Sequence, residues 1–426
     1  MNPQRVAVVG AGWAGLAAAV HACLAGHAVS LFEMAPRAGG RARSVRVDGI
    51  ELDNGQHILI GAYHATLELM RLVGVDPGRW LTRLPLSLQT PDGRGLRLEA
   101  GRPLPAFVRG VLHQRSWTLG QRLGLLAAAA SWGLAGFRCT SDLTVAELCA
   151  GLSEPVRRDL IEPLCVAALN TPATQASARV MLRVLRDALF GGRGSSDLLL
   201  PRPGLDALLP APASAWLADQ GAALHVGHRV QTVEREGLGW RVDGRDFDAV
   251  VLACSAVEAA RLSAPIAPHW SATAGALRYE PIVTVYLRCD DAHLQAPMVA
   301  LPSHDEAPAQ FAFDLGALGG APGVFAFVSS GARDWVERGL ATVAEASLAQ
   351  AGRDFPRATW PRPPTVLHVT AEKRATFRCT PALQRPSARI ADGLLAAGDY
   401  VEGPYPATLE GAVRSGIAAA RALAAP

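Results

Sequence analysis

Residues 5–20 read Arg5-Val-Ala-Val-Val-Gly10-Ala-Gly12-Trp-Ala-Gly15-Leu-Ala-Ala-Ala-Val20. The apolar run before Gly10 predicts a buried strand, the glycines predict a tight turn, and the alanine-rich run predicts a helix. Residues 28–32, Ala-Val-Ser-Leu-Phe, predict a second strand that ends at Glu33. Strand, helix and strand in this order form a βαβ unit, which predicts an α/β fold with a parallel, Rossmann-like sheet.

The glycines of this unit follow the pattern G-x-G-x-x-G, which is typical of a dinucleotide-binding turn. Gly10 permits the turn, Gly12 lets the backbone approach a pyrophosphate, and Gly15 lets the helix pack closely on the strands. The phosphates are expected at the N-terminus of the helix, where free N–H groups favour anions. Glu33 follows about 20 residues later, where a carboxylate accepts hydrogen bonds from a ribose.

Length and charge limit the functions that the chain can have. Its 426 residues are enough for two or three domains with a large core. The net charge of +3 is small for this length and gives no reason to expect a nucleic-acid partner. Nearly all positive charge is arginine, and Lys373 is the only lysine.

The seven cysteines are scattered and odd in number, and no two have C-x-x-C spacing. This pattern predicts a reducing compartment, no disulfide framework and no metal site. Because the glycine motif follows a strand within the first ten residues, we expect no secretory signal and a cytoplasmic location.

Two more motifs lie soon after the second strand. The sequence Gly39-Gly40-Arg41 can bring backbone N–H groups and a guanidinium to a pyrophosphate. Residues 45–52 alternate as a strand, which leads into Asp53-Asn-Gly55-Gln56-His57, and residues 62–73 predict an amphipathic helix.

Residues 76–204 are mainly helical in pattern. The run at 104–137 leads through Trp117 into residues 119–137, which are rich in alanine, glycine and leucine and carry Gln121 and Arg122 near their start. We expect a buried helix there, or one that lies against a lipid-like substrate or a membrane surface, rather than a spanning helix. Residues 142–190 predict further helices, with a capping box at Thr144 and Glu147.

The α/β pattern then returns. A helix at 206–220, a strand at 223–233 and a hairpin with a buried strand at 240–254 are predicted first. Strands at 281–289, 309–315, 323–329 and 364–370 follow, with a helix at 334–351 among them, and the chain closes with a strand at 389–395 and a helix from 408. We expect a discontinuous dinucleotide-binding domain at 1–75, 205–265 and 385–426. A substrate domain of α+β type takes 76–204, with the helical apolar insertion, and 266–384.

These motifs together resemble the FAD-dependent amine oxidase and phytoene desaturase superfamily. The resemblance rests on the βαβ unit with Glu33, on Gly39-Gly40-Arg41, on Gly398-Asp399 and on residues 409–416, Leu-Glu-Gly-Ala-Val-Arg-Ser-Gly. Within the superfamily, residues 52–63 and 403–416 are most similar to the hydroxysqualene dehydroxylases, flavoproteins of bacterial hopanoid pathways.

The resemblance implies that FAD lies extended across the first domain. Glu33 would bind the adenosine ribose, Val230 the adenine through its backbone, and Asp399 the ribityl-phosphate part. The residues implied in cofactor binding are Gly10, Gly12, Trp13, Ala14, Gly15, Glu33, Gly39, Gly40, Arg41, Gly55, Gln56, His57, Val230, Gly398, Asp399, Thr408 and Leu409. Many relatives carry an arginine two residues after the ribose glutamate, where this chain has Ala35, and Arg37 is the candidate to replace it.

The resemblance also bears on the reaction. Amine oxidases of this group place a lysine in the strand that corresponds to residues 281–289, which has none here; the aligned position is Leu287. This favours chemistry on a hydrocarbon, and the implied reaction is reductive dehydroxylation of hydroxysqualene to squalene by hydride transfer from reduced flavin. The leaving hydroxyl needs an acid, and the candidates are His57, Asp53 and Tyr405. His57 comes first because its ordinary pKa is closest to neutral, with a neutral structural histidine as the alternative.

Two alternative functions remain open at this stage. One is a carotenoid-type desaturase, which runs the same fold in the oxidative direction on a polyisoprenoid. The other is a non-catalytic protein of the same fold that binds prenylated partners. For a C30 substrate the helices at 104–137 and 142–190 would line an apolar tunnel, and peripheral contact with the inner face of the cytoplasmic membrane would admit the substrate.

Overall fold

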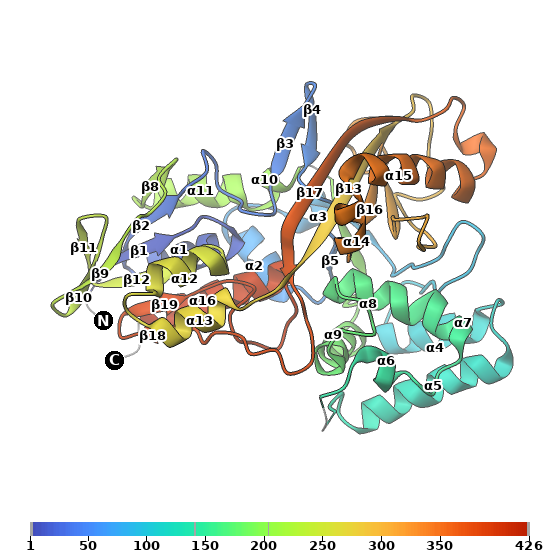
Figure 1. Ribbon diagram of the computed structural model, residues 1–426, viewed down its shortest axis with the longest axis horizontal. Coiled ribbons are helices and arrows are strands. Elements are labelled where there is room, and N and C mark those ends of the chain that lie inside the picture. Colours follow the sequence, from blue (N-terminus) through green and yellow to red (C-terminus); the bar gives the residue numbers. More distant parts are fainter. Residues whose placement is uncertain (1–2, 140–141, 203, 424–426) are drawn as a thin grey trace.

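The computed structural model describes residues 3–139, 142–202 and 204–423 (Figure 1). Its largest sheet has the order β18-β19-β12-β1-β2-β8, and all neighbours are parallel except β18 and β19. The strands are β1 (Arg5–Val9), β2 (Ala28–Glu33), β8 (Ala223–Val226), β12 (Ala249–Leu252), β18 (Arg389–Ala391) and β19 (Leu394–Ala396). The predicted parallel sheet of Rossmann type is therefore confirmed.

Helices cover this sheet because alternate residues of its buried strands face opposite sides. Val6 and Val8 of β1 pack with α1 (Trp13–Leu24), α11 (Pro210–Asp219) and α16 (Leu409–Leu423). The intervening side chains of β1 belong to the apolar cluster that contains α12 (Ala256–Ser263) and α13 (Pro268–Gly275). The three-stranded sheet of β9 (Val233–Glu236), β10 (Gly239–Val242) and β11 (Arg245–Phe247) contributes to the same cluster.

A second, antiparallel sheet has the order β14-β15-β16-β13-β17. Its strands are β13 (Tyr279–Arg288), β14 (Met298–Ala300), β15 (Phe311–Asp314), β16 (Val324–Ser329) and β17 (Thr365–Phe377), which confirms the four strands expected between 281 and 370. One face packs against α14 (Arg333–Arg338) and α15 (Leu340–Asp354). The helix predicted at 334–351 is thus two helices, because Gly339 has a φ of +98° and breaks the run.

The helical insertion lies beside the second sheet (Figure 1). It contains α4 (Pro103–His113), α5 (Leu119–Leu134), α6 (Val145–Leu148), α7 (Glu154–Val156), the π-turn Arg157–Ile161, α8 (Glu162–Leu169) and α9 (Ala178–Phe190). The predicted capping box of Thr144 and Glu147 is present, and Thr118 and Gln121 form another at the start of α5. Side chains of this insertion and of the inner face of the second sheet share one apolar cluster.

The structure corrects one expectation for residues 104–137. They hold α4 and α5, which are separated by residues 114–118, and α5 is not the buried helix expected as one alternative, since Leu125 is its only fully buried residue. Among the described residues, no helix combines the length and the apolar character that crossing a membrane requires. The alternative of a helix that lies against an apolar surface remains a prediction.

Shorter elements connect the two sheets. The hairpin of β3 (Ser44–Val47) and β4 (Ile50–Asp53) precedes a three-stranded sheet of β5 (Leu59–Ile60), β7 (Leu198–Pro201) and β6 (Leu81–Leu84). This small sheet pairs residues from both sides of the expected boundary between 75 and 76. The predicted helix at 62–73 is α2 (His64–Leu72), and α3 (Pro77–Trp80) follows it.

Two other predicted elements are shorter than expected. The helix at 206–220 is divided into α10 (Leu205–Leu208) and α11, since Leu209 leaves the helical conformation before Pro210, which starts α11. The strand at 223–233 ends with β8 at Val226, because Gly227 has a φ of +70°. Residues 227–232 therefore form a loop at the edge of the large sheet.

Candidate functional site

The three glycines of the first turn are needed for different physical reasons. Gly10 has a φ of +106°, and a Cβ there would lie 2.7 Å from the carbonyl oxygen of Ala253. A Cβ on Gly15 would lie 1.8 Å from the Gly10 carbonyl oxygen, so helix α1 needs this glycine to approach the turn. Gly12 is not crowded, because its Cβ would have only the Cα of Gly40, at 3.9 Å, within contact distance. A side chain on Gly12 would instead fill the space in front of the helix.

The N-terminus of α1 is open to an anion. Gly12 is its N-cap residue, no side chain caps it, and its first turn carries no acidic residue. Uncapped N–H groups at a helix start favour a negatively charged ligand. The indole N–H of Trp13 donates to the carbonyl oxygen of Ala42 at 3.2 Å, which anchors the next loop beside the helix start.

Glu33 lies at the end of β2, next to the glycine turn. Its carboxylate accepts hydrogen bonds from the backbone N–H groups of Ala11 and Ala35, both at 2.8 Å. An ionised carboxylate has about four acceptor positions, so Glu33 retains capacity for the hydroxyl groups of a ribose. Arg37 pairs with Asp206 at 3.6 Å instead of pointing to Glu33.

The second glycine motif lies directly against the first. The Gly39 N–H donates to the Ala11 carbonyl oxygen at 2.9 Å, and Gly39 and Gly40 both have positive φ, +122° and +63°. Arg41 then joins this N-terminal loop to the C-terminal part of the chain. Its guanidinium donates to Asp399 Oδ1 at 2.6 Å and to the carbonyl oxygen of Ala375 at 2.7 Å.

The C-terminal segment completes the cradle. The Gly398 N–H donates to Ser415 Oγ at 3.1 Å, and the Thr408 hydroxyl accepts from the Gly411 N–H at 3.1 Å, at the start of α16 with Leu409. The hydroxyl of Tyr400 is buried and has no hydrogen-bond partner among the described residues. These segments fit a polar cofactor that carries phosphate groups. The start of α1 is uncapped, Gly12 leaves open space in front of it, and the buried Tyr400 hydroxyl is without a partner in the described part of the chain.

Sequence reasoning missed the residue that shapes this segment. Arg385 is partly buried and lies over the ring of Phe377, 4.6 Å from its centroid, and it donates to five backbone carbonyl groups. The acceptors are the carbonyl oxygens of Asp399, Tyr400, Val401, Gly403 and Tyr405. A lone arginine in a loop has no sequence pattern that reveals such a role.

Val230 lies in the loop that follows β8. It is buried, and its carbonyl oxygen accepts a hydrogen bond from Arg261 Nη2 at 2.6 Å. Its contact with an adenine stays a prediction, as do the other cofactor contacts of individual residues.

Gly55, Gln56 and His57 meet strand β13 of the second sheet. The Gln56 amide donates to the Tyr286 hydroxyl at 3.3 Å, and this hydroxyl donates to the Asp53 carbonyl oxygen at 2.7 Å. A Cβ on Gly55 would lie 3.8 Å from the hydroxyl of Thr284, which is buried and has no partner among the described residues. Thr284 and Tyr286 thus face the Gly55 loop.

The side chain of Leu287 points to the opposite face of β13. Leu287 is therefore not the position to compare with the lysine of the amine oxidases, contrary to the expectation from the sequence. Its side chain belongs to the apolar cluster under α14 and α15. Since side chains alternate along a strand, Thr284 and Tyr286 are the positions of β13 that face the Gly55 loop. Neither is a lysine, and Lys373 is exposed on β17.

The structure separates the three candidate acids. His57 Nδ1 is 2.8 Å from the Gly55 carbonyl oxygen, and burial together with Arg41 lowers the pKa of His57. The carboxyl of Asp53 accepts from Ser44 Oγ and from the Leu205 N–H, both at 2.9 Å. Burial raises the pKa of Asp53 to about 7.

Tyr405 lies in a separate polar cluster. Its hydroxyl donates to Asp187 Oδ2 at 2.9 Å and accepts from Arg183 at 3.0 Å. The guanidinium groups of Arg183 and Arg414 lie over its ring, 4.9 and 5.3 Å from the centroid. Burial and Asp187 raise the pKa of Tyr405. Within the described residues, no hydrogen bond joins Tyr405 to Asp53 or His57.

Comparisons with known proteins place this site in a family. Residues 13–424 match the family model of flavin containing amine oxidoreductases. Relatives from Rhodopseudomonas palustris and Sinorhizobium fredii, both named hydroxysqualene dehydroxylase, are 31% and 28% identical, and each alignment covers 98% of this chain and 97–98% of the relative. A zeta-carotene desaturase from Synechocystis is 28% identical over 54% of this chain and 50% of its own.

Solved structures give the same fold. An oxidoreductase from Methanosarcina mazei superposes with a TM-score of 0.73 at 17% identity, covering 97% of this chain and 99% of the other. A putrescine oxidase superposes with a TM-score of 0.71 at 16% identity over the full length of both chains. The chain is therefore an FAD-dependent oxidoreductase that belongs to the flavin-containing amine oxidoreductase family.

Proposed function

We propose that this protein catalyses the FAD-dependent reductive dehydroxylation of hydroxysqualene to squalene. The observation that carries the proposal is similarity over nearly the whole chain to relatives named hydroxysqualene dehydroxylase. Similarity to the zeta-carotene desaturase covers only about half of the chain, and two phytoene desaturases that match 99% of it are only 25% and 23% identical. The three-part division into cofactor and substrate domains, with the boundaries expected from the sequence, is part of this proposal.

The cofactor is proposed to lie between the two chain ends. The turn at Gly10–Gly15, the Gly39-Gly40-Arg41 loop and the start of α16 would hold its phosphates and flavin, and Glu33 its ribose. When bound in reduced form, FAD supplies a hydride to carbon. The reaction then consumes one hydride and one proton and releases one water molecule, and a C–H bond replaces the C–O bond.

This chain must supply the proton for the leaving hydroxyl group. Among the candidates, Asp53 has a pKa of about 7 and is therefore protonated in a large fraction of molecules near neutral pH. His57 is held neutral by burial, so we propose that it positions the Gly55 carbonyl group rather than donating the proton. Asp53 Oδ2 accepts no hydrogen bond from the described residues, which leaves that oxygen free to carry the proton.

The apolar cluster between the helical insertion and the second sheet supports a hydrocarbon substrate. It joins Tyr286, Phe311 and Phe313 of the sheet with side chains of α8 and of the π-turn. Such walls exclude water, which would otherwise capture an allylic cation, and their aromatic faces favour positive charge.

The test is anaerobic incubation of the chemically reduced holoprotein with hydroxysqualene, followed by mass spectrometry. Squalene formed in proportion to flavin oxidised supports the proposal. Oxidised holoprotein that instead introduces double bonds into phytoene, without forming squalene from hydroxysqualene in the first assay, supports the desaturase alternative. The non-catalytic alternative finds no support, since the relatives reported above are all named as enzymes.

A further inference from the structure

The outward surface of α5 is apolar where a helix in water is normally polar. Its outward positions recur every three or four residues, and they are Leu119, Leu123, Ala127, Ala130 and Leu134. The three leucines are 64%, 51% and 92% exposed. A helix that faces water carries charged and polar residues on that side, and a continuous exposed apolar face marks an interaction site.

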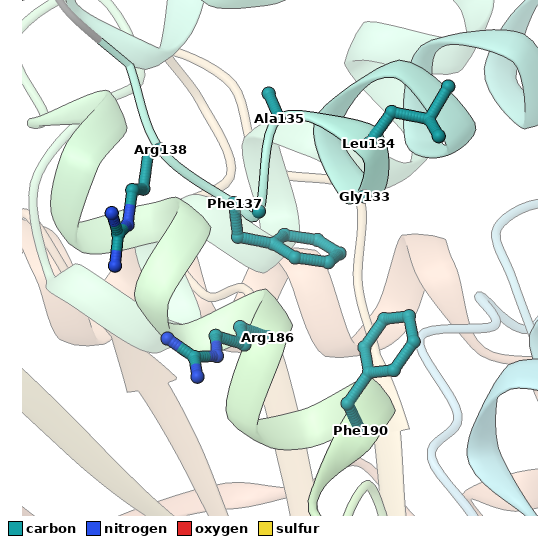
Figure 2. Close-up of a pocket in the computed structure, with 8 residues that line it drawn as sticks. Gly133, Leu134, Ala135, Phe137, Arg138, Arg186 and Phe190 are labelled. Carbon is teal, nitrogen blue, oxygen red and sulfur yellow. The ribbon is translucent and has the colours of Figure 1, made fainter.

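The end of this face has a cationic hollow. An open hollow of about 600 Å³ lies there. Figure 2 shows Leu134, Phe137 and Phe190 around it, with Arg138 and Arg186 on one side. The two phenylalanine rings are 5.3 Å apart. Neither arginine forms an ion pair with any described residue, so two like charges share the hollow without a carboxylate. An occupant that is apolar in one part and anionic in another satisfies both features.

The sequence around α5 has the same charge bias. Between Glu99 and Asp142 there are five arginines and no aspartate or glutamate, although the whole chain has 41 basic and 38 acidic residues. Helix α4 adds exposed Leu104 and Leu112 to this region. Leucine and phenylalanine next to arginine, without carboxylates, is the composition of a surface that lies in the interface of an anionic bilayer.

We propose that α5, α4 and the C-terminal end of α9 form a docking face for an anionic lipid bilayer. The apolar stripe of α5 inserts among the acyl chains, and Arg138 and Arg186 bind lipid phosphate groups. This proposal goes beyond the proposed reaction and does not depend on it. If both hold, the face brings the protein to the phase in which a C30 alcohol dissolves.

Flotation of the FAD-loaded protein with vesicles tests the proposal. Vesicles of phosphatidylcholine alone are compared with vesicles that also contain phosphatidylglycerol, at low and high salt. Wild-type protein is expected to float with the anionic vesicles and to float less at high salt. Two double variants, Leu123→Gln with Leu134→Gln and Arg138→Gln with Arg186→Gln, are each expected to lower the partition coefficient by about tenfold or more.

Matched controls separate this face from general surface effects. Leu238→Gln replaces a leucine that is 95% exposed on the β9–β10 turn, and Arg357→Gln with Arg362→Gln removes two exposed arginines before β17. These variants are expected to float like wild type. The proposal is overturned if wild type does not bind anionic vesicles, if test and control variants bind equally, or if the leucine variants disrupt a dimer instead.

Turnover in detergent micelles keeps this test distinct from that of the proposed function. Both double variants of the docking face are expected to retain wild-type turnover of hydroxysqualene there, because none of the changed residues lies in the cofactor cradle. Vesicle binding by a protein that does not turn over hydroxysqualene would refute only the proposed reaction.

Discussion

Substitutions of single glycines in the first turn distinguish a role in cofactor binding from a role in folding. Gly12→Ala adds a methyl group that meets no backbone atom closer than 3.9 Å and needs no unusual φ, so the fold is expected to remain intact. The methyl group enters the space in front of α1, and we expect the Kd for FAD to rise about 10- to 100-fold, the equivalent of overpacking by one methyl group. Flavin fluorescence titration measures this change.

Gly15→Ala is the contrasting variant of the same prediction. Its methyl group would lie 1.8 Å from the Gly10 carbonyl oxygen, so α1 must shift away from the turn. We expect lower stability as well as lost FAD binding, with a cost of about 3 kcal/mol or more. Equal thermal stability of the two variants without FAD would contradict this assignment.

The buried carboxyl of Asp53 makes stability depend on pH. Its pKa is raised to about 7 from an ordinary value of 3.8, so between these pH values the folded protein holds a proton that the unfolded chain has lost. The free energy of unfolding therefore falls as pH rises through this window and levels off above about 7, by at most about 4 kcal/mol. Asp53→Asn keeps an acceptor for Ser44 and Leu205 but cannot ionise. Urea unfolding at pH 5 and pH 8 should show that the free energy of unfolding of the variant rises relative to that of wild type at the higher pH. An equal difference between variant and wild type at both pH values would refute a proton held by folded Asp53.

The same residue gives a prediction for turnover. If Asp53 donates the proton, wild-type turnover falls as pH rises above about 7, and Asp53→Asn is slower by roughly 10²-fold or more. His57→Gln is expected to bind FAD and to stay within a few-fold of wild type, because the neutral imidazole only holds the Gly55 carbonyl group. A 10²-fold loss in His57→Gln, with little effect of Asp53→Asn, would return the role of the acid to His57.

The tight turn at Gly10 and the close approach of α1 at Gly15 could be predicted, because both glycines belong to one short motif between β1 and α1. The contact of Glu33 with a ribose stays a prediction. The roles of Arg385 and Tyr286 could not be predicted, since their hydrogen bonds reach a loop 14–20 residues away and a strand about 230 residues away. Asp53 was a candidate from its position, but its raised pKa follows from burial beside α10, which no local pattern shows.

For secondary-structure elements, the sequence predicts whether a segment is a helix or a strand better than it predicts where the segment begins and ends. Apolar runs identified four of the five strands of the second sheet, and they are clearest in β13, β15 and β16, which are almost wholly buried. Strand β14, which has only three residues, was not predicted. Apolar periodicity also joined helices that the structure divides at Leu209 and Gly339, where one residue leaves the helical region. The buried alternative for α5 was wrong, since an alanine-rich apolar run has the composition of a buried helix but α5 is largely exposed.

The joint between α2 and α16 depends on one buried carboxylate. Glu410 is 1% exposed and accepts from the Ala65 N–H, from the Thr66 N–H and hydroxyl, and from Arg414. Glu410→Ala leaves these donors unpaired, and we expect the free energy of unfolding to fall by about 3 kcal/mol. Glu410→Gln, which keeps an acceptor, should lose less. Urea unfolding measures both, and the exposed Glu345→Ala on α15 serves as the control; a Glu410→Ala loss no larger than that of the control would refute the role.

The whole molecule brings together segments that are far apart in the chain. The large sheet takes strands from residues 5–33, 223–252 and 389–396, and Gly416 lets α16 approach α1 so closely that a Cβ would lie 2.1 Å from the Ala14 carbonyl oxygen. The order of these segments could be predicted from the motifs. Their contacts could not, because the Arg41–Asp399 ion pair and the loop of Arg385 depend on three-dimensional closure.

This closure predicts how FAD stabilises the protein. Since the proposed cofactor contacts come from both chain ends, FAD binding should slow amide hydrogen exchange in residues 9–24 and in residues 397–413 together. At a free concentration 100 times its Kd, FAD is expected to add about 2.7 kcal/mol to the free energy of unfolding. Asp399→Asn, which weakens the pair with Arg41, should reduce protection of both segments. Protection confined to residues 9–24 would mean that the C-terminal segment does not hold the cofactor, and would refute a site built from both ends.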